Sequence, residues 1–304
     1  MVIFVDNIIH FKLIQKNMAT KNKKNNDSLR LFVQKITKLP TIPVVAHEIL
    51  SITNNDLAPL DKLEKIVSKD PAISAKIVGL SNAAFFGYRM PHANVASAIK
   101  KIGFINVKNI ALSISLMTIF DNKHLKFSHD YGRIYRHSIA TGLVALRLAG
   151  NLGIRQDDDL FLSGLLHDLG LLLLSSYFPD LYTKSAEAAR ECKNLLEAET
   201  RVLGFTHADI GAWIADTWDL SDTLHEVIMH HHTPSHAGKY KGTVALVHLA
   251  DYITCKRFFS MCEQNVYCPL DPLALSLLNM PEKNFDDIAS GVPDNMFADG
   301  IFEP

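Results

Sequence analysis

Residues 160–176, LFLSGLLHDLGLLLLSS, form an almost continuous apolar run with one histidine and one aspartate near its centre, His167 and Asp168. The acidic residues 157–159 precede the run and can cap a helix, so the pattern predicts a helix that is buried nearly all round. A carboxylate inside such a helix costs several kcal/mol unless a cation or a hydrogen-bond network compensates it. Asp168 must therefore have a buried partner, and the fold has to supply one.

The rest of the chain also has helical periodicity, and no alternating run is long enough to predict a strand. Asp70 and Pro71 predict an N-cap and the first residue of a helix, and Asn106 predicts the N-cap of a very apolar helix that runs to Phe120. Residues 131–151 predict one long helix that ends near Gly150. The chain is therefore predicted to be all-α.

Composition and helix-breaking residues divide the 304 residues into four segments. Residues 1–27 include a Lys- and Asn-rich stretch and are predicted to be a disordered lead-in. Residues 28–121 are predicted to form an N-terminal helical subdomain, and residues 122–270 a second helical subdomain with the metal site. Residues 271–304 are predicted to be a C-terminal extension that packs on the core, because they mix prolines, acids and apolar residues.

Charge and cysteine content exclude several classes of protein. The net charge of -1 gives no global attraction to nucleic acid or to an anionic membrane, so neither is expected as a partner. The four cysteines have no C-x2-C spacing and predict neither a disulfide framework nor a structural zinc knuckle. The apolar runs at the N-terminus are too interrupted for a membrane span. These features predict a cytoplasmic protein.

Seven side chains in the second half are candidates for metal ligation. Imidazole and carboxylate groups together suit divalent transition metals. On a helix, His167 and Asp168 point about 100° apart, so both reach one site only if a helix end or the metal lies between them. Of the three consecutive histidines 230–232, only two can readily point toward the same site. The candidates are His137, His167, Asp168, His207, His231, His232 and Asp251.

Each candidate taken alone has a plainer explanation. His137 follows Arg136 and fits a surface or helix-packing histidine, and His207 fits a capping histidine at a helix start. Asp251 lies three residues after His248 on the same helix face, which fits a buried hydrogen bond between the two. The prediction of a metal site rests on the combination. Both buried aspartates need partners, and one site shared with the histidines would satisfy both.

The ordered residues resemble known families. His137, His167-Asp168 and Asp251 resemble the H...HD...D signature of the HD superfamily of helical metal-dependent phosphohydrolases. His207 in HADIG and the paired histidines in HHTP resemble the second-metal ligands of HD-GYP phosphodiesterases. From LPTIPVVAHEIL through DPAISAKIVGLSNAAFFG to VHLADYI, the chain looks most like an HDOD domain, the HD-related output domain of bacterial signalling proteins. This resemblance implies an HD-superfamily helical bundle preceded by an N-terminal helical subdomain.

The resemblance also implies roles for the seven residues. His137, His167, Asp168 and Asp251 would hold one metal ion, and His207, His231 and His232 would hold a second. Asp168 would bridge the two ions and is the one residue for which the resemblance implies a catalytic role, while His230 is a neighbour. Two divalent ions are implied, with iron favoured by similarity to HD-GYP proteins and manganese, nickel, cobalt or zinc left open.

The chain departs from active HD-GYP enzymes at two places. Leu171 stands where the HDxGK motif has a lysine, and HHTPSHAG lacks both the GYP tripeptide and the acidic residue after the paired histidines. Two hypotheses stay open beside a metal-free hydrogen-bonded core. One is a signalling protein that binds a protein partner or a nucleotide-type ligand. The other is a metal-dependent phosphohydrolase acting on a nucleotide or cyclic dinucleotide. Enzymatic activity and oligomeric state remain open.

Overall fold

The structure of the protein, a computed structural model, describes residues 43–52, 59–81, 94–117, 131–154, 159–258 and 269–291. Every regular element in these ranges is a helix, so the predicted all-α fold class is confirmed. The predicted lead-in of residues 1–27 and the predicted boundary between residues 121 and 122 lie outside the described residues, as do residues 292–304. The division of the chain into subdomains therefore stays a prediction.

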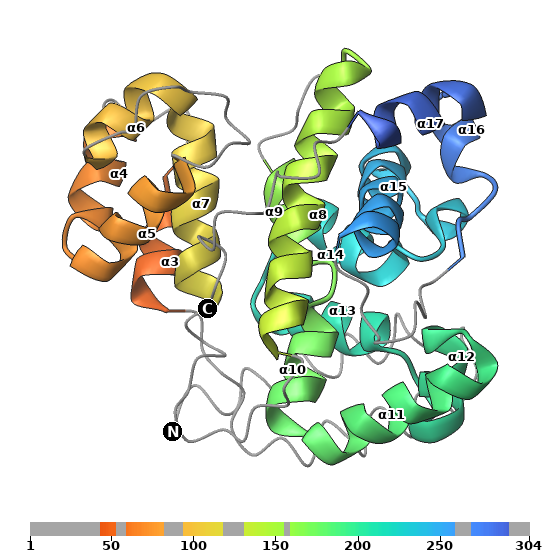
Figure 1. Ribbon diagram of the computed structural model, residues 1–304. Helices are drawn as coiled ribbons and strands as arrows, with labels where there is room; N and C mark the ends of the chain where they lie inside the picture. The colour runs from red at the N-terminus through yellow and green to blue at the C-terminus, as the bar shows by residue number, and fades with distance from the viewer. Residues whose placement is uncertain are drawn as a thin grey trace.

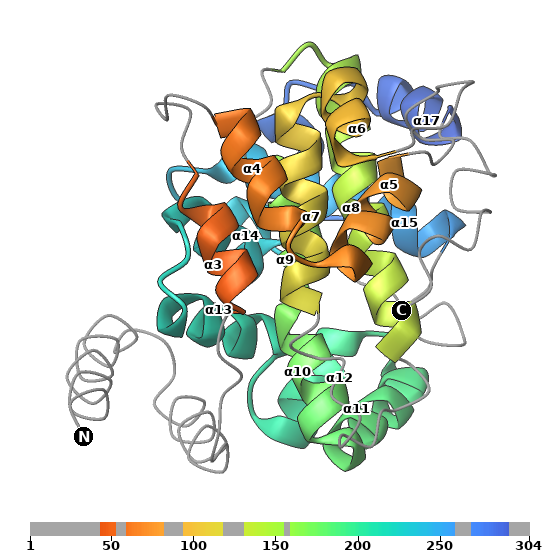
Figure 2. The same ribbon diagram turned by 90° about the vertical axis from the view of Figure 1, so that its left-hand side faces the viewer.

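The first half of the chain packs around α7 (Phe104–Met117). This helix is apolar along most of its length, and its described side chains from Ile110 to Leu116 are all buried. Figure 2 shows α7 between the four described helices that surround it. Its contacts with α3, α5 and α6 are more extensive than its contacts with α4. The surrounding helices are α3 (Val44–Leu50), α4 (Pro59–Val67), α5 (Pro71–Ser81) and α6 (Val95–Ile102).

Of the two helix N-caps predicted in this half, one is confirmed and the other is wrong. The carboxylate of Asp70 accepts the backbone N–H of Ile73 at 3.1 Å, which is the predicted cap of α5. The predicted cap at Asn106 was wrong, because α7 begins earlier and the Asn106 side chain donates to the carbonyl oxygen of Ile102 at 2.7 Å. Gly103, with φ +85°, ends α6 and lets α7 begin at the next residue.

The second half is built on α8, which lies beside α9 and α15 (Figure 1). Helix α10 packs on α13, α13 on α14, and α11 on α12, while α7 contacts α9 and joins the two halves. The elements are α8 (Tyr131–Asn151), α9 (Leu160–Leu166), α10 (Leu169–Tyr177), α11 (Pro179–Cys192), α12 (Leu195–Leu203), α13 (His207–Thr217), α14 (Asp222–His230), η2 (Pro234–His236), α15 (Lys241–Arg257), α16 (Ala274–Leu277) and α17 (Glu282–Ser290).

Two glycines bring α8 and α9 into close contact. A Cβ atom on Gly164 of α9 would lie 2.6 Å from the Cα of Gly142 in α8. A Cβ atom on Gly142 would lie 2.7 Å from the backbone oxygen of Phe161. Only glycine permits this approach, because any side chain would collide with backbone atoms. The contact holds His137 of α8 close to His167, the residue that follows α9.

A second glycine contact joins α10 to α13. A Cβ atom on Gly170 would collide with the carbonyl oxygen of His207 and would lie 3.0 Å from the backbone nitrogen of Gly211. A Cβ atom on Gly211 would in turn lie 2.6 Å from the side chain of Ile228 in α14. These close approaches place the start of α10 against the start of α13. Asp168 and His207 are thereby brought to the same place.

The apolar run that predicted one helix is divided at its two polar residues. Helix α9 ends at Leu166 and α10 begins at Leu169, and Asp168 has φ -97° and ψ 24°, outside helical geometry. The backbone carbonyl of Asp168 starts α10 by accepting the N–H of Leu172 at 3.1 Å, so its carboxylate does not cap the helix. The interruption provides the helix end that lets His167 and Asp168 face one site.

The same run is the one described segment whose length and apolar composition would allow a membrane span. The segment Leu160–Tyr177 has a mean hydropathy of 1.4, yet 94% of it is buried inside the protein. A core helix of a folded domain has the same composition, and this segment packs against α8, α11, α13 and α14. Its apolar character is therefore accounted for by the core.

The described part of the C-terminal segment packs on α15. Met280 and Phe285 are buried there, and the rings of Phe285 and Tyr252 have their centroids 6.2 Å apart. The guanidinium of Arg147, on α8, donates to the carbonyl oxygen of Gly291 at 3.0 Å. Residues 269–291 thus cover the outer side of α15, the helix that carries Asp251.

Candidate metal centre

The seven predicted side chains come together between α8, α9, α10, α13, α14 and α15. His137 projects from α8 and Asp251 from α15, His167 and Asp168 lie at the break between α9 and α10, and His207 begins α13. His231 and His232 directly follow α14. Six of the seven are buried, and His232 is half-buried. The plainer explanations of a surface His137 and an exposed capping His207 were wrong, since both are fully buried.

The first group of donors surrounds Asp251 and one oxygen of Asp168. The Nε2 atom of His137 lies 3.0 Å from Asp251 Oδ1, and the Nε2 atom of His167 lies 3.1 Å from Asp168 Oδ2. The two Nε2 atoms are 3.3 Å apart. Two imidazoles and two carboxylates at these separations are a set of donors that fits one divalent ion.

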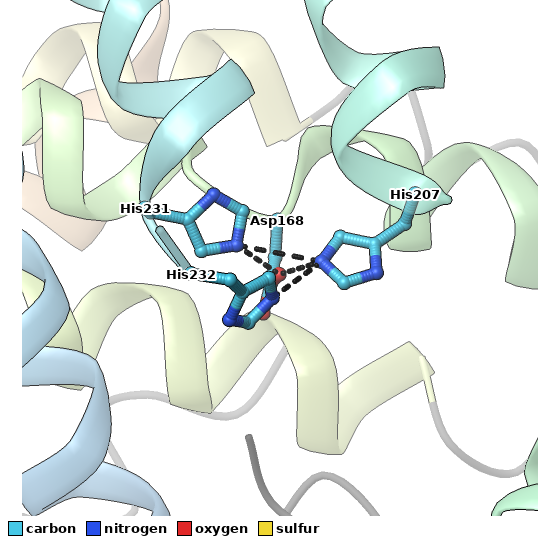
Figure 3. Close-up of side chains that lie close together, drawn as sticks. All are labelled: Asp168, His207, His231 and His232. Atoms are coloured by element: carbon cyan, nitrogen blue, oxygen red, sulfur yellow. Dashed lines mark hydrogen bonds and ion pairs between the residues drawn. The ribbon is translucent and has the colours of Figure 1, made fainter. Parts of the chain in front are cut away.

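The second group of donors surrounds the other oxygen of Asp168. Figure 3 shows the imidazoles of His207, His231 and His232 turned toward this carboxylate. Asp168 Oδ1 lies 3.3 Å from His207 Nε2 and 3.5 Å from His231 Nε2, and His232 Nε2 lies 2.9 Å from His207 Nε2. The ligand atoms of these four residues all lie within 4.8 Å of one another.

Asp168 belongs to both groups, with a different oxygen in each. Its Oδ2 atom faces His137 and His167, and its Oδ1 atom faces His207 and His231. The Oδ1 atom is buried and has no hydrogen-bond partner in the structure. A buried carboxylate oxygen with ring nitrogens at ion-pair distance and no hydrogen bond fits a metal ligand, and the two-sided placement fits a bridging one.

Backbone carbonyl oxygens fix the tautomers of two of the histidines. The Nδ1 atoms of His167 and His231 lie 2.7 and 2.9 Å from the carbonyl oxygens of Gly164 and Ile228. A carbonyl oxygen can only accept, so each Nδ1 carries the proton and donates it. In a neutral ring the Nε2 lone pair is then available toward the cluster, which is how metal-bound histidines are held in proteins.

The buried carboxylates of the cluster favour positive charge beside them. Burial opposes protonation of His167, yet the Asp168 carboxylate raises the pKa of that imidazole to about 10. Burial likewise opposes protonation of His207, and Glu199 with Asp168 raises its pKa to about 10. Burial would raise the pKa of Asp168, but the adjoining imidazoles hold it well below its usual range. The residues present therefore fit divalent cations, which would replace these protons.

Metal uptake is consequently expected to release protons. At pH 7 the His167 and His207 rings, with pKa values of about 10, carry protons that an ion at Nε2 must displace. Addition of a divalent metal chloride to the chelated protein should release about two protons per chain from these two rings in a pH-stat titration. Because protons compete, affinity should fall as pH is lowered. Metal uptake with no proton release would contradict the prediction.

The structure adds Glu199, which the sequence analysis did not identify. Its carboxylate is fully buried and accepts the backbone N–H of His207 at 2.9 Å and the Nδ1–H of the same residue at 2.8 Å. In α12, Glu199 lies four residues after buried Leu195, on the apolar face. This position was the available signal, because a carboxylate on an apolar helix face needs a buried partner.

The Glu199→Gln variant is expected to bind metal about 10- to 100-fold more weakly at the position that includes His207. The amide loses the negative charge that orients the imidazole and increases the basicity of its Nε2 atom. Competition with a chromogenic chelator measures the change. The control is Glu197→Gln, an exposed carboxylate two residues away on the same helix. Equal affinities for the two variants would contradict this role.

His248 supports the centre but does not pair with Asp251 as the sequence allowed. Its Nδ1–H donates to the carbonyl oxygen of His231 at 2.6 Å, and its Nε2 accepts the backbone N–H of Asp271 at 2.8 Å. The bond to His231 holds the backbone beside a candidate ligand, and the bond to Asp271 ties the C-terminal segment to α15. His230, the neighbour left out of the predicted set, ends α14 and lies outside the groups of candidate ligands.

The position of the HDxGK lysine lies in the core. Leu171 is 2% exposed and sits in the first turn of α10. An apolar side chain cannot place a positive charge beside a phosphate. This position therefore supplies none of the charge stabilisation that a lysine would contribute to phosphoryl transfer.

A family model described as the HDOD domain matches residues 39–234. The chain belongs to the HDOD domain family. The matched range contains six of the seven candidate ligands, and Asp251 lies beyond it on α15. The HDOD match therefore spans both the N-terminal helices and most of the metal centre, as the resemblance in the sequence implied.

One curated relative matches most of the chain. An uncharacterized protein of Treponema pallidum (strain Nichols) is 25% identical over 255 residues, which are 83% of this chain and 48% of the relative. The chain thus spans about half the length of the curated relative that it matches.

Solved structures share the fold at low sequence identity. An HDOD domain protein of unknown function from Geobacter sulfurreducens is 21% identical with a TM-score of 0.72, and the match covers 91% of this chain and 93% of that one. A protein from Marinobacter aquaeolei VT8 assigned to signal transduction is 20% identical with a TM-score of 0.69, over 91% and 65% of the chains. A protein from Shewanella amazonensis SB2B assigned as a metal-dependent phosphohydrolase is 21% identical with a TM-score of 0.56, over 88% and 99%. These likenesses show the HDOD fold.

Proposed function

We propose that this HDOD protein is a cytoplasmic signalling module whose dinuclear metal centre binds a nucleotide-type ligand or a signalling partner without turning it over. The observation that carries the proposal is Asp168, which presents one oxygen to each group of donors and has a buried Oδ1 atom with no hydrogen-bond partner. The assignment of the Marinobacter aquaeolei protein of similar fold to signal transduction supports the same class.

Two ions would be held by the two groups of donors. His137, His167, Asp168 and Asp251 would hold the first, and Asp168 with His207, His231 and His232 would hold the second. Bound ions would supply concentrated positive charge for phosphate oxygens and Lewis acidity. The chain's own residues fix the Nε2 lone pairs and exclude water from the buried side of the centre. Iron is the favoured metal, with manganese, nickel, cobalt and zinc as alternatives.

Leu171 separates the proposed function from the second candidate, a metal-dependent phosphohydrolase acting on a nucleotide or cyclic dinucleotide. The complete set of seven donors favours the second candidate, because four of them resemble the metal signature of HD-superfamily phosphohydrolases and three resemble the second-metal ligands of HD-GYP phosphodiesterases. The buried Leu171 favours binding without turnover, because charge that develops on a phosphate in the transition state finds no cation at this position.

The test combines elemental analysis with ligand binding and turnover on the purified chain. We expect about two ions per chain, metal-dependent calorimetric binding of inorganic phosphate or a cyclic dinucleotide, and no hydrolysis of bis(p-nitrophenyl) phosphate beyond the chelated control. Metal-dependent hydrolysis that Asp168→Ala abolishes would instead establish the phosphohydrolase. A chain without stoichiometric metal would overturn both functions.

A further inference from the structure

Cys255 lies one helical turn after Asp251 on α15, so the two side chains share a face of the helix. The thiol is buried, with 7% of the residue exposed, and its Sγ atom lies 3.5 Å from Asp251 Oδ1. That oxygen is the same atom that lies 3.0 Å from His137 Nε2. The cysteine is therefore in contact with the first group of donors, although no HD-type motif includes it.

Three different donor types converge at this point. A ring nitrogen of His137, a carboxylate oxygen of Asp251 and the Sγ atom of Cys255 all lie within 4.8 Å of one another, and all three residues are buried. In the adjoining group the buried Oδ1 atom of Asp168, with no hydrogen-bond partner, also faces the cluster. The sulfur thus belongs to a set of buried ligand atoms that already has the composition of a metal site.

Cys192 provides an internal comparison. It is half-buried at the end of α11, and its thiol donates to the carbonyl oxygen of Asn194 at 3.1 Å. Its contact is with the backbone at a helix end, and it belongs to none of the groups of candidate ligands. The two remaining cysteines, Cys262 and Cys268, lie outside the described residues.

We propose that Cys255 supplies a thiolate ligand to the metal ion held by His137 and Asp251, so that this position is a mixed nitrogen, oxygen and sulfur site. The inference rests on the proposed function, because it requires an ion at the first group of donors. On binding, the S–H bond breaks as the sulfur–metal bond forms, and the proton leaves to solvent. No oxidation or reduction is involved.

A thiolate changes which metals the position prefers. Soft sulfur ligands favour zinc, iron and cobalt, whereas carboxylate and water ligands suit magnesium and manganese. Loss of the sulfur should therefore weaken zinc binding by at least about tenfold, the smallest effect expected even for a group that only supports a ligand. Manganese binding should weaken less than zinc binding.

Cobalt substitution tests the proposal directly. Co²⁺ added to the chelated full-length chain should give visible d–d bands from binding to the centre and a near-ultraviolet sulfur-to-cobalt charge-transfer band. Cys255→Ser should lose the charge-transfer band and keep the d–d bands, because serine retains the hydrogen bond to Asp251. Cys192→Ser is the matched control and should keep both sets of bands.

The outcomes separate this inference from the proposed function. Visible bands without a charge-transfer band in the unmodified chain would overturn the thiolate ligand and leave the metal centre in place. A charge-transfer band that survives in Cys255→Ser would overturn it equally, because another cysteine would be its source. Absence of all cobalt bands would contradict the proposed function itself. Measurement on the unmodified chain keeps the test decisive even if Cys255→Ser does not fold.

Discussion

The Asp168→Ala variant is expected to purify without metal, whereas the unmodified chain should carry about two ions. The reason is that Asp168 contributes one oxygen to each group of donors, so its removal takes a ligand and a negative charge from both. The second group would then keep three histidines but no carboxylate, and no residue would face both groups. Elemental analysis of the two purified proteins measures the difference.

Thermal unfolding provides a second readout of the same change. A ligand that binds only the folded state stabilises it by about 4 kcal/mol at a thousandfold excess over its dissociation constant. For a domain of this size that corresponds to a rise in melting temperature on the order of 10 °C. Chelation should therefore lower the melting temperature of the unmodified protein and leave that of Asp168→Ala unchanged.

His230→Ala is the matched control for both measurements. This histidine directly precedes the two candidate ligands His231 and His232 but lies outside the groups of donors. The variant should retain the metal content and the response to chelation of the unmodified chain. If His230→Ala lost metal while Asp168→Ala kept it, the assignment of ligands would be wrong.

The Gly170→Ala variant is expected to destabilise the fold and displace a ligand together. The added Cβ atom would collide with the carbonyl oxygen of His207, a backbone atom that cannot move aside as a flexible side chain can. Overpacking of this kind costs about 1–3 kcal/mol. The melting temperature should fall by about 2–4 °C for each kcal/mol. Metal affinity should fall as well, because separating α10 from α13 moves His207 away from Asp168.

Gly242→Ala separates this effect from the general consequence of replacing a helical glycine. Gly242 lies near the start of α15, and a Cβ atom there would meet nothing within 4 Å. Alanine is the better helix former by about 1 kcal/mol, so this variant should be as stable as the parent or more stable. Comparable losses of melting temperature in the two variants would show that the contact between α10 and α13 is not the cause.

The sequence was most informative where a polar residue interrupted an apolar pattern. Asp168 in its apolar run required a buried partner, and the order of the histidines around it matched the HD-type signature. The same reasoning applied to Glu199 would have found a second buried carboxylate, because this residue also occupies an apolar helix face. Cys255 gave no such signal, since a cysteine on a buried face is ordinary core packing until its neighbours are known.

Helix boundaries near the site could not be read from the local pattern. The run around His167 has continuous helical propensity, yet the chain breaks there and starts again at Leu169. The close approach of α10 to α13 at Gly170 constrains where α10 can begin. That contact joins residues far apart in the sequence. Helix propensity describes the local preference of each residue, and tertiary contacts override it.

The sequence by itself therefore determined the fold class, the family and the types of side chain available to bind metal. Periodicity and the energetic cost of a buried carboxylate are local properties, and both can be read along the chain. Only the tertiary structure decided which oxygen of Asp168 faces which histidines, which acceptors fix the imidazole tautomers, and that Glu199 and Cys255 lie against the cluster. These are distances between helices, and they depend on where glycine lets two backbones touch.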